Sequence, residues 1–334
     1  MVKLADIAKK LNLSLTTVSR ALNDYSEVSQ KTKELVRKTA KEMEYVPNSS
    51  ARSLALKKSH LISLFCYDYG EPISYQSFNF EVIAGIKNYF GNTLYDLIIV
   101  PERPKHKSRE SLKNICYSRG FDGLFVVGIR TDDPYLEELK EDFIPAVVID
   151  YPLTGRRISY VESDNIKGCR LAIDYFVSKG HKNIAFINGH SFAAVSSVRL
   201  HGYKLALEKN GIQFSPELAI VSDYSEEGGY NSTQRLLQDK GNISAIFAAS
   251  DIMAVGAIKA LRDRKLKVPE DVAVIGFDDI FFAEYAHPGL TTIRQHKFDM
   301  GYQGSQLLQK IIEQPDYIPK RKRLNVELII RDSA

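Results

Sequence analysis

Apolar residues in the first 45 positions recur at helical spacing. In the segment 4–11 (LADIAKKL) they follow one another at intervals of three and four residues, which predicts an amphipathic helix. Asn12 tolerates the left-handed backbone of a tight turn, and the Ser14 hydroxyl can cap a second helix. A third amphipathic stretch begins after another cap residue, Ser29. Three helices with a tight first turn form a helix-turn-helix module.

The second of these helices has an unusual polar side. Within residues 11–23 (LNLSLTTVSRALN), one side is apolar and the other carries hydroxyl groups and one guanidinium. The major groove of DNA admits one helix, and its hydrogen-bond pattern is read by short polar side chains and by Arg paired to guanine. We expect base contacts from Leu15, Thr16 and Arg20. The residues expected to hold phosphates or otherwise contribute to DNA binding are Ser14, Thr17, Ser19, Asn23, Ser29 and Thr32.

From residue 62 onward the pattern changes to short apolar runs that alternate with amphipathic stretches. LISLFCYD, YDLIIVP, GLFVVG, AVVIDY, NIAFING, AIFAASD and VAVIGFD are each followed by a polar turn. This alternation predicts parallel sheets with helices on both faces. The runs suffice for two lobes, with chain crossings expected near residues 160–165 and 290–295. Ligands of such sheets bind beyond the carboxyl ends of the strands, here in the cleft between the lobes.

The positive charge is concentrated at the beginning of the chain. The whole sequence carries a net charge of +4. Residues 1–60 hold 12 Lys or Arg against 6 Asp or Glu, a net +6, and the remainder holds 33 against 35, a net −2. This asymmetry is expected when one small module meets a polyanion, although a solvated basic helix surface would produce it too.

Two motifs in the first 60 residues carry a family resemblance. DIAKKLNLSLTTVSRALN and YVPNSSARSL resemble the DNA-binding headpiece and hinge of the lactose/galactose repressor family of bacterial transcription regulators. The resemblance implies that Leu15, Thr16 and Arg20 read bases in the major groove. It also implies a hinge helix, capped by Asn48, that places Ala51 and Leu54 in the minor groove, with Leu54 as a wedge between base pairs.

The resemblance continues through the rest of the chain. FDGLFVVG, ESDNIKG, GHKNIAFING, SSVRLHGY, ASDIMAVGA, VPEDVAVIGFDD and HPGLTTIRQ are similar to the family's effector domain, which itself is similar to periplasmic sugar-binding proteins. Arg199 and Asp278 match the family's most dependable ligand contacts, and Ser250 stands where the family usually has Asn. The complete set of effector-binding residues implied by the resemblance is Tyr67, Phe78, Asp150, Arg199, Tyr224, Ser250 and Asp278.

These observations predict three parts of the chain. Residues 1–46 are the helix-turn-helix headpiece, residues 47–60 are the hinge helix and linker, and residues 61–334 are a two-lobed α/β domain for effector binding and dimerisation. One lobe is expected to contain residues 61–161 and 293–325. The other is expected to contain residues 162–292 and 326–334.

Several alternative chemistries have weaker support in the sequence. NGHSFA around Ser191 approximates the nucleophile elbow of serine hydrolases, but Ala193 replaces its last glycine and no Asp and His follow at suitable positions. The KRKR run at residues 320–323 is interpreted as a solvated connection before a strand. The three cysteines have neither disulfide nor zinc spacing, and we expect buried thiols, no metal and no cofactor. A membrane span and a secretory leader are not apparent, which favours a cytoplasmic protein.

The sequence therefore predicts a non-enzymatic, ligand-responsive and sequence-specific DNA-binding regulator. The preferred hypothesis is a homodimeric repressor of a carbohydrate-utilisation operon, which binds a pseudo-palindromic operator and is released by a sugar. One alternative is a repressor that uses a purine or nucleoside corepressor, since a carboxylate, an Arg and an aromatic ring suit both ligand classes. A second alternative is a sugar-binding protein with no role in gene regulation.

Overall fold

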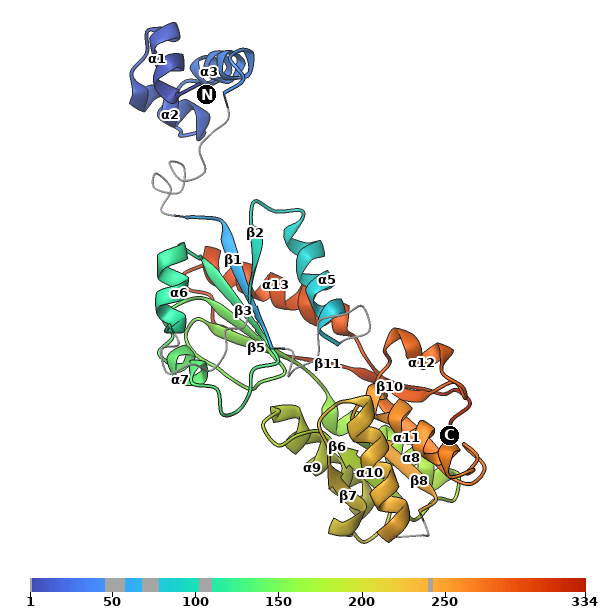
Figure 1. The fold of residues 1–334 in the computed structure, drawn as a ribbon. Helices are drawn as coiled ribbons and strands as arrows, with labels where there is room; N and C mark the ends of the chain where they lie inside the picture. The colour runs from blue at the N-terminus through green and yellow to red at the C-terminus, as the bar shows by residue number, and fades with distance from the viewer. Residues whose placement is uncertain (1, 46–57, 68–77, 102–109, 240–242) are drawn as a thin grey trace. The chain divides into compact units, whose positions relative to one another are not determined.

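The computed structural model describes residues 2–45, 58–67, 78–101, 110–239 and 243–334. The chain divides into two compact units, Met1–His60 and Leu61–Ala334 (Figure 1). The described part of the first unit is helical, and the second unit contains two sheets covered by helices. The expected hinge residues Asn48, Ala51 and Leu54 lie outside the described residues.

Residues 2–45 of the first unit form a headpiece of three helices. Its helices are α1 (Leu4–Leu11), α2 (Leu15–Leu22) and α3 (Gln30–Glu42). Asn12 ends α1 in the left-handed conformation at φ 52°, as expected. Ser14 caps α2 by accepting a hydrogen bond from the Thr17 amide at 3.0 Å, and Ser29 caps α3 in the same way. The apolar sides of the three helices form one small core of Ile7, Ala8, Val18, Ala21, Val36 and Ala40.

The first lobe of the second unit is built on a six-stranded parallel sheet with the strand order β11-β5-β4-β3-β1-β2. Its strands are β1 (Leu61–Cys66), β2 (Asp96–Val100), β3 (Gly123–Val127), β4 (Ala146–Ile149), β5 (Ile158–Ser163) and β11 (Arg321–Leu324). Central strands such as β3 and β4 are buried throughout, because helices cover both faces.

Among the described residues, four helices cover the first sheet. They are α5 (Phe78–Phe90), α6 (Leu112–Arg119), α7 (Tyr135–Lys140) and α13 (Lys297–Glu313). Side chains from α5 and α13 share one apolar cluster, and those from α6 and α7 share another. The backbones of α5 and α13 approach very closely, since a β-carbon at Gly85 would lie 2.0 Å from the Phe298 oxygen and one at Gly301 would lie 2.0 Å from the Val82 oxygen.

The second lobe contains a six-stranded sheet with the strand order β12-β10-β9-β8-β6-β7, in which only β12 is antiparallel to its neighbour. The strands are β6 (Ile184–Asn188), β7 (Ala219–Val221), β8 (Ala245–Ala248), β9 (Ala273–Asp278), β10 (Thr291–Gln295) and β12 (Val326–Ile329). The helices are α8 (Asn165–Ser178), α9 (Ala194–Lys209), η1 (Pro216–Leu218), α10 (Glu226–Asp239), α11 (Asp251–Asp263) and α12 (Phe281–Tyr285).

The chain passes three times between the lobes. It crosses after β5, after β10 and between β11 and β12. The expected lobe boundaries at residues 161/162 and 292/293 fall inside β5 and β10, and the actual crossings come a few residues later. Pairing with β11 and β12 explains this difference, because it extends β5 to Ser163 and β10 to Gln295.

Residues 321–323 of the KRKR run lie in an edge strand, which corrects the expectation of a connection, whereas the run is exposed to solvent as expected. Arg321–Leu324 is β11, and it pairs in parallel with β5. Arg321 and Arg323 both donate hydrogen bonds to the Glu162 carboxylate on the neighbouring strand. Charged side chains on an exposed edge strand are consistent with pairing on one side only.

Three further findings concern the cysteines, membrane-spanning helices and metal sites. Cys66, Cys116 and Cys169 are buried free thiols, as expected. In the described part of the chain, no helix is both long and apolar enough to span a bilayer. Across the same residues, no group of His, Cys, Asp or Glu has the arrangement of a metal site.

Candidate effector site and DNA-reading surface

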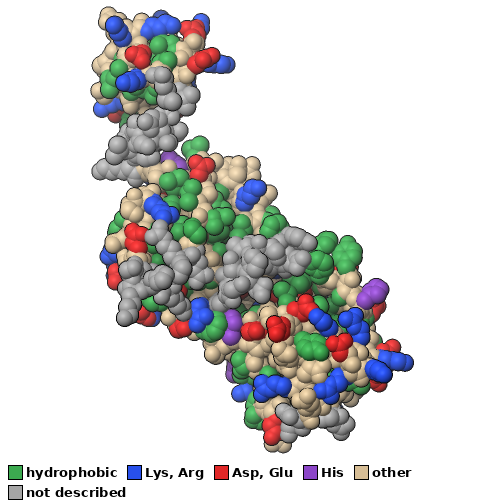
Figure 2. Space-filling view, in the orientation of Figure 1, with side chains coloured by type: hydrophobic (Ala, Val, Ile, Leu, Met, Phe, Trp, Pro, Cys, Tyr) green, Lys and Arg blue, Asp and Glu red, His purple; other side chains and the backbone are tan. Residues whose placement is uncertain are grey.

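The α2 helix presents one polar side to solvent. Val18 and Ala21 are buried against the other headpiece helices, whereas Leu15, Thr16 and Arg20 are exposed. Leu15 is 52% exposed, which is high for a leucine in a helix. Figure 2 shows Lys and Arg side chains spread over the surface of this unit. The three expected base-reading residues therefore share an accessible surface of one helix.

Four hydroxyl groups of the headpiece form hydrogen bonds at the starts of α2 and α3. The Ser14 and Thr17 hydroxyl oxygens are 2.8 Å apart, and those of Ser29 and Thr32 are also 2.8 Å apart. Asn23 donates from its side chain to the Ser19 carbonyl at 2.9 Å. The two hydroxyl pairs fix the starts of α2 and α3, whereas Asn23 caps the end of α2. The exposed amides of a helix start favour a phosphate.

One lysine of the headpiece is buried and forms an ion pair within this unit. The Lys33 ammonium lies 3.1 Å from the Asp24 carboxylate and donates to the Asp24 carbonyl. Arg37 binds the same carboxylate at 2.8 Å. The hydrogen bond from Lys33 and the nearby positive charges lower the pKa of Asp24. Lys33 is therefore buried, and it fixes the loop between α2 and α3.

The expected effector residues of the second unit gather at the carboxyl ends of strands. Asp150 follows β4 in the first lobe, and Tyr224, Ser250 and Asp278 follow or end β7, β8 and β9 in the second lobe. Arg199 reaches the same region from α9. Parallel strands present their carboxyl ends at a common edge, so the alternation of strands and helices brings these distant residues together.

Arg199 is the central cation of this group, and only 3% of it is exposed. Its Nε donates to the Asn165 side-chain oxygen at 2.8 Å, and its Nη1 donates to the Ala249 carbonyl at 2.6 Å. The guanidinium carbon lies 3.9 Å from the centroid of the Phe277 ring. Two hydrogen bonds and one ring contact therefore fix the guanidinium plane, and Nη2 is directed toward Asp278.

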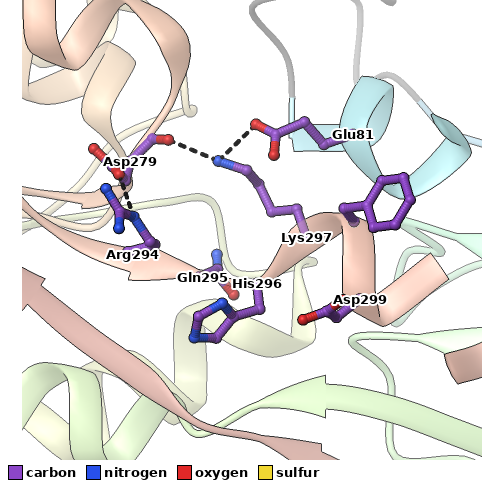
Figure 3. A pocket seen from close by; sticks show the side chains of 8 residues that line it. Glu81, Asp279, Arg294, Gln295, His296, Lys297 and Asp299 are labelled. Carbon is purple, nitrogen blue, oxygen red and sulfur yellow. Dashed lines mark hydrogen bonds and ion pairs between the residues drawn. The ribbon is translucent and has the colours of Figure 1, made fainter. Parts of the chain in front are cut away.

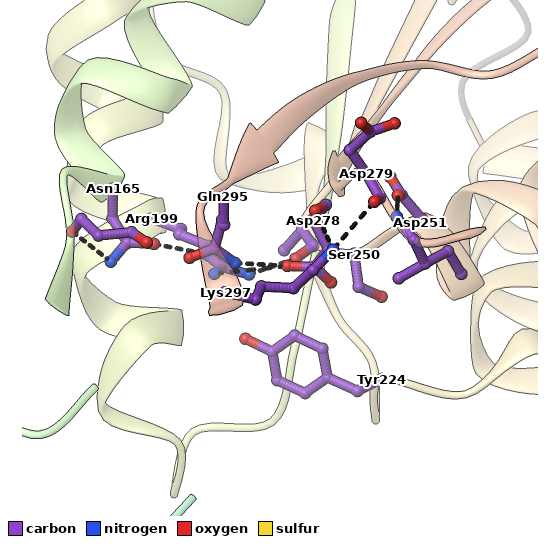
Figure 4. A network of polar contacts seen from close by, with 12 residues as sticks. Asn165, Arg199, Tyr224, Ser250, Asp251, Asp278, Asp279, Gln295 and Lys297 are labelled. Atoms are coloured by element: carbon purple, nitrogen blue, oxygen red, sulfur yellow. Dashed lines mark hydrogen bonds and ion pairs between the residues drawn. The ribbon is translucent and has the colours of Figure 1, made fainter. Parts of the chain in front are cut away.

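Asp278 lies between two cations and an amide. Its Oδ1 accepts a hydrogen bond from Gln295 at 2.6 Å, and its main-chain carbonyl accepts one from Lys297 at 2.7 Å. Figure 4 shows these residues as one chain of polar contacts that continues to Arg199 and Asn165. Burial raises the pKa of the Asp278 carboxyl, and the charges of Arg199 and Lys297 oppose this effect.

Asp150 has an incompletely satisfied carboxyl group. Its Oδ1 is buried and has no hydrogen-bond partner among the described residues. Burial raises the pKa of this carboxyl to about 7, and the positive charge of Arg199 partly offsets the rise. The backbone of Asp150 is left-handed at φ 58°. A buried oxygen of this kind is suited to accept a hydrogen bond from a ligand hydroxyl.

Ser250 has a structural contact in addition to its place near the cleft. Its hydroxyl caps α11 by accepting a hydrogen bond from the Met253 amide at 3.3 Å. The adjacent Asp251 is fully buried, and its carboxylate accepts hydrogen bonds from the Ile280 amide and the Thr292 hydroxyl. Burial raises the pKa of Asp251 to about 7. Asp251 thus anchors the segment that directly follows β9. Asp278 is the last residue of β9.

Tyr224 supplies the aromatic face of the group. Its hydroxyl is 2.9 Å from the Ser196 hydroxyl, and burial raises its pKa. The ring lies directly against Gly189, where an added β-carbon would be only 1.9 Å from a ring carbon. The absence of a side chain at position 189 therefore allows this ring position.

Two expected effector residues have a different environment. Tyr67 follows β1 and is 3% exposed within the apolar cluster beneath α6 and α7. Phe78 begins α5 and packs against the cluster on the other face of the same sheet. Their side chains belong to the cores of the first lobe rather than to the polar group around Arg199. The Ser191 hydroxyl, considered above as a nucleophile, is in an exposed turn before α9.

A polar cavity lies beside the second crossing of the chain, and it shares Gln295 and Lys297 with the group around Arg199. It has a volume of about 260 Å³ and contains the Lys297 ammonium, which is 3.0 Å from Glu81 and also binds the Asp279 carbonyl (Figure 3). Arg294 and Arg331 bind the Asp279 carboxylate at 2.6 and 2.8 Å. Lys297 therefore links α5 of the first lobe to the end of β9 in the second.

Sequence reasoning did not find several residues of the site. Three of them lie where the chain passes between the lobes: Gln295 ends β10, and Asn165 and Lys297 begin the helices α8 and α13 that follow β5 and β10. Their only sequence signal is that they are polar residues directly at the ends of apolar runs. A crossing segment lies beside both lobes, so its side chains are well placed to contribute to the group around Arg199.

The arrangement can bind a small polar ligand by paired acceptors and donors beside an aromatic ring. A helix-turn-helix headpiece followed by two lobes with such a site defines a ligand-responsive transcription regulator. Residues 3–48 match the family of bacterial regulatory proteins called the lacI family, and residues 173–334 match a periplasmic binding protein-like domain. The chain belongs to the lacI family of bacterial regulatory proteins.

Known proteins resemble the chain along its whole length. The probable HTH-type transcriptional repressor ExuR of Bacillus subtilis (strain 168) is 33% identical over 337 residues, which cover 100% of this chain and 98% of that protein. A complex of the transcriptional regulator CelR with cellobiose has a TM-score of 0.77 and 29% identity, with 100% of both chains covered. A Lac repressor dimer bound to operator and the anti-inducer ONPF has a TM-score of 0.83 and 26% identity, covering 99% of this chain and 98% of that one.

Proposed function

We propose that this regulator represses a carbohydrate-utilisation operon in the cytoplasm and is released from its operator by a sugar. The observation that carries this proposal is the group of Arg199, Asp278 and Asp150 beside the Tyr224 ring. Carboxylates and a guanidinium accept from and donate to vicinal hydroxyls, and a flat ring packs against the apolar side of a sugar. The similar CelR structure contains cellobiose, which supports the sugar assignment.

DNA reading is assigned to the exposed side of α2. Leu15, Thr16 and Arg20 are the proposed base-reading residues, with Arg20 paired to a guanine. The proposed phosphate contacts are the hydroxyl and amide groups of Ser14, Thr17, Ser19, Asn23, Ser29 and Thr32. Asn48, Ala51 and Leu54 are proposed to form the minor-groove part of the site on the basis of the family resemblance.

A homodimer is proposed on the basis of exposed apolar side chains. On α12, Phe281 and Tyr285 are 58% and 63% exposed and their ring centroids are 5.0 Å apart. On β2, Ile98 and Ile99 are also exposed. Grouped exposed apolar residues are typical of association surfaces, and the similar Lac repressor structure is a dimer. Two headpieces in one dimer would match a pseudo-palindromic operator.

Effector control follows from coupled equilibria. A ligand that favours one arrangement of the two lobes shifts the regulator between states that differ in operator affinity, by its differential affinity for those states. The proposed role is regulatory rather than catalytic. A purine or nucleoside corepressor is the second candidate effector, because the Tyr224 ring and a carboxylate also suit a nucleobase.

The proposal is tested with full-length protein in two steps. Selection from a random duplex library should yield a sequence with dyad symmetry that is bound in preference to a scrambled competitor. Thermal-shift screening against neutral sugars, sugar acids, nucleosides and purines should then show stabilisation by a sugar, and that sugar should reduce operator binding. No duplex preference would contradict the DNA-binding role, and stabilisation by purines alone would favour the second candidate effector.

A further inference from the structure

The turn between β6 and α9 in the second lobe contacts the first lobe directly. The Thr131 amide of the first lobe donates a hydrogen bond to the Phe192 carbonyl at 2.9 Å. Next to it, Arg130 and Ala193 form an isolated antiparallel bridge. These residues lie far in sequence from the three crossings of the chain. The two lobes are therefore joined by a noncovalent contact as well as by the crossing segments.

Arg130 strengthens this contact through its side chain. The guanidinium carbon lies 3.4 Å from the centroid of the Phe192 ring, a stacking distance. On the first-lobe side, its Nε and Nη2 donate to the two oxygens of Asp132 at 2.7 and 2.8 Å. The bidentate pair holds the guanidinium plane in one orientation, and that plane faces the Phe192 ring.

The Phe192 ring connects this contact to the proposed effector site. The His190 ring stacks on Phe192 with a centroid distance of 3.5 Å and an interplanar angle of 14°. His190 in turn meets Tyr224 edge to face at 5.1 Å, and Tyr224 is fixed by Ser196. A continuous series of ring contacts thus runs from a first-lobe cation to the aromatic residue of the cleft.

We propose that Arg130 is an effector-positioning residue: by stacking on Phe192 it holds the two lobes together over the cleft and fixes the His190 and Tyr224 rings against the bound sugar. This inference rests on the proposed function, because it takes the cleft as the effector site. A ligand that contacts Tyr224 in one lobe and Asp150 in the other binds best when the lobes are together. Arg130 stabilises that arrangement and is therefore coupled to ligand affinity.

The first experiment needs no ligand. Hydrogen exchange of the Thr131 amide reports the inter-lobe hydrogen bond in the full-length protein. Arg130→Ala and Phe192→Ala should each accelerate this exchange about tenfold or more. The amides of Leu124 and Ser222, whose hydrogen bonds lie within one lobe, should keep the wild-type rate. Unchanged exchange at Thr131 in Arg130→Ala would overturn the proposal.

A double-mutant cycle tests whether the two side chains act together. Arg130→Ala combined with Phe192→Ala should accelerate Thr131 exchange no further than either single change, because each already removes the stack. Multiplied effects would show that the residues act independently and would overturn the proposal. Asp132→Asn is the matched control, since it weakens the ion pair but retains the stacked guanidinium, and its effect should be several-fold smaller than that of Arg130→Ala.

The second experiment measures ligand affinity with defined sugars. D-glucose, D-galactose, D-ribose and cellobiose are titrated against the wild-type and Arg130→Ala proteins by thermal shift. Any of them that stabilises the wild type should require at least about tenfold more sugar in the variant. Equal affinity in both proteins would overturn the positioning role. If none of the four stabilises the wild type, the sugar assignment is weakened, and the exchange experiment still decides the inference.

Discussion

The Arg199 Nη2 atom lies 3.9 Å from the Asp278 Oδ1 atom, although both side chains are almost completely buried. The pair is thus close enough for electrostatic attraction but longer than a direct hydrogen bond. Asp278 instead receives its hydrogen bond from Gln295, and Arg199 gives its own to Asn165 and Ala249. Other residues hold the Arg199 guanidinium and the Asp278 carboxylate in place, and these two groups are not hydrogen-bonded to each other. Both groups therefore remain available to a ligand.

Arg199→Lys is expected to impair both stability and effector binding. A lysine ammonium cannot reproduce the fork that reaches Asn165 and Ala249, so buried acceptors lose their donors. We expect a loss of about 1 to 3 kcal/mol in the free energy of unfolding. The effector response should be lost as well. Urea unfolding followed by circular dichroism and thermal-shift titration measure the two effects, and an unaltered effector response would contradict the role of Arg199.

Asp150 is expected to make stability depend on pH in a defined direction. Because burial raises its folded pKa from 3.8 to about 7, the folded state retains a proton that the unfolded state releases. Ionisation therefore costs stability progressively as the pH rises from about 4 to 7. Asp150→Asn cannot ionise, so its stability relative to the wild type should increase across this range by roughly 1 to 4 kcal/mol.

Urea unfolding of both proteins at several pH values between 4 and 8 measures this difference. Asp251 and Asp278 have raised pKa values too, but they are present in both proteins and their contributions largely cancel in the comparison. A constant stability difference across the range would mean that Asp150 titrates near its unfolded value. Asp150→Asn should also weaken effector binding at pH 8, where the wild-type carboxylate is the better acceptor.

The sequence was most informative where its pattern was periodic. The helix expected at residues 4–11 is α1, and the apolar runs expected as strands correspond to β1, β2, β3, β4, β6, β8 and β9. Short or polar strands such as β7 and β11 were missed, because Ala219–Val221 is only partly buried and Arg321–Leu324 consists mainly of charged residues. Hydrophobic pattern identifies a strand only when one or both of its faces are covered.

Reasoning from the sequence identified only part of the candidate site. Arg199, Asp278, Asp150 and Tyr224 were placed by resemblance, and the structure brings them to one edge of the two sheets. Side chains that support them depend on contacts between residues far apart in sequence. Gln295 binds a residue 17 positions away, and Arg199 binds one 34 positions away. No local pattern predicts such a pair.

Gly189→Ala is expected to displace Tyr224. The new methyl group would lie 1.9 Å from a ring carbon, so the ring must move and its hydrogen bond with Ser196 must be lost. Overpacking of this kind costs about 1 to 3 kcal/mol of stability, and we expect a marked loss of effector affinity. Ser191→Ala in the same turn is the control, and it should have neither effect. Effector binding equal to wild type in Gly189→Ala would exclude a role for the Tyr224 position.

Arg20→Ala is expected to change which operators the protein prefers. Arg20 is exposed on α2, and a guanidinium paired to guanine contributes specificity at one base pair. We expect a loss of about 1 to 3 kcal/mol in operator binding and relaxed selectivity at that position.

Lys9→Ala on α1 removes another exposed cation and is the matched control. If Lys9 meets a phosphate, its loss should weaken binding to all duplexes alike. Titration of both variants against the selected operator, its single-base variants and a scrambled duplex at fixed salt separates these outcomes. Equal losses on operator and scrambled DNA for Arg20→Ala would assign Arg20 to phosphate binding instead of base reading.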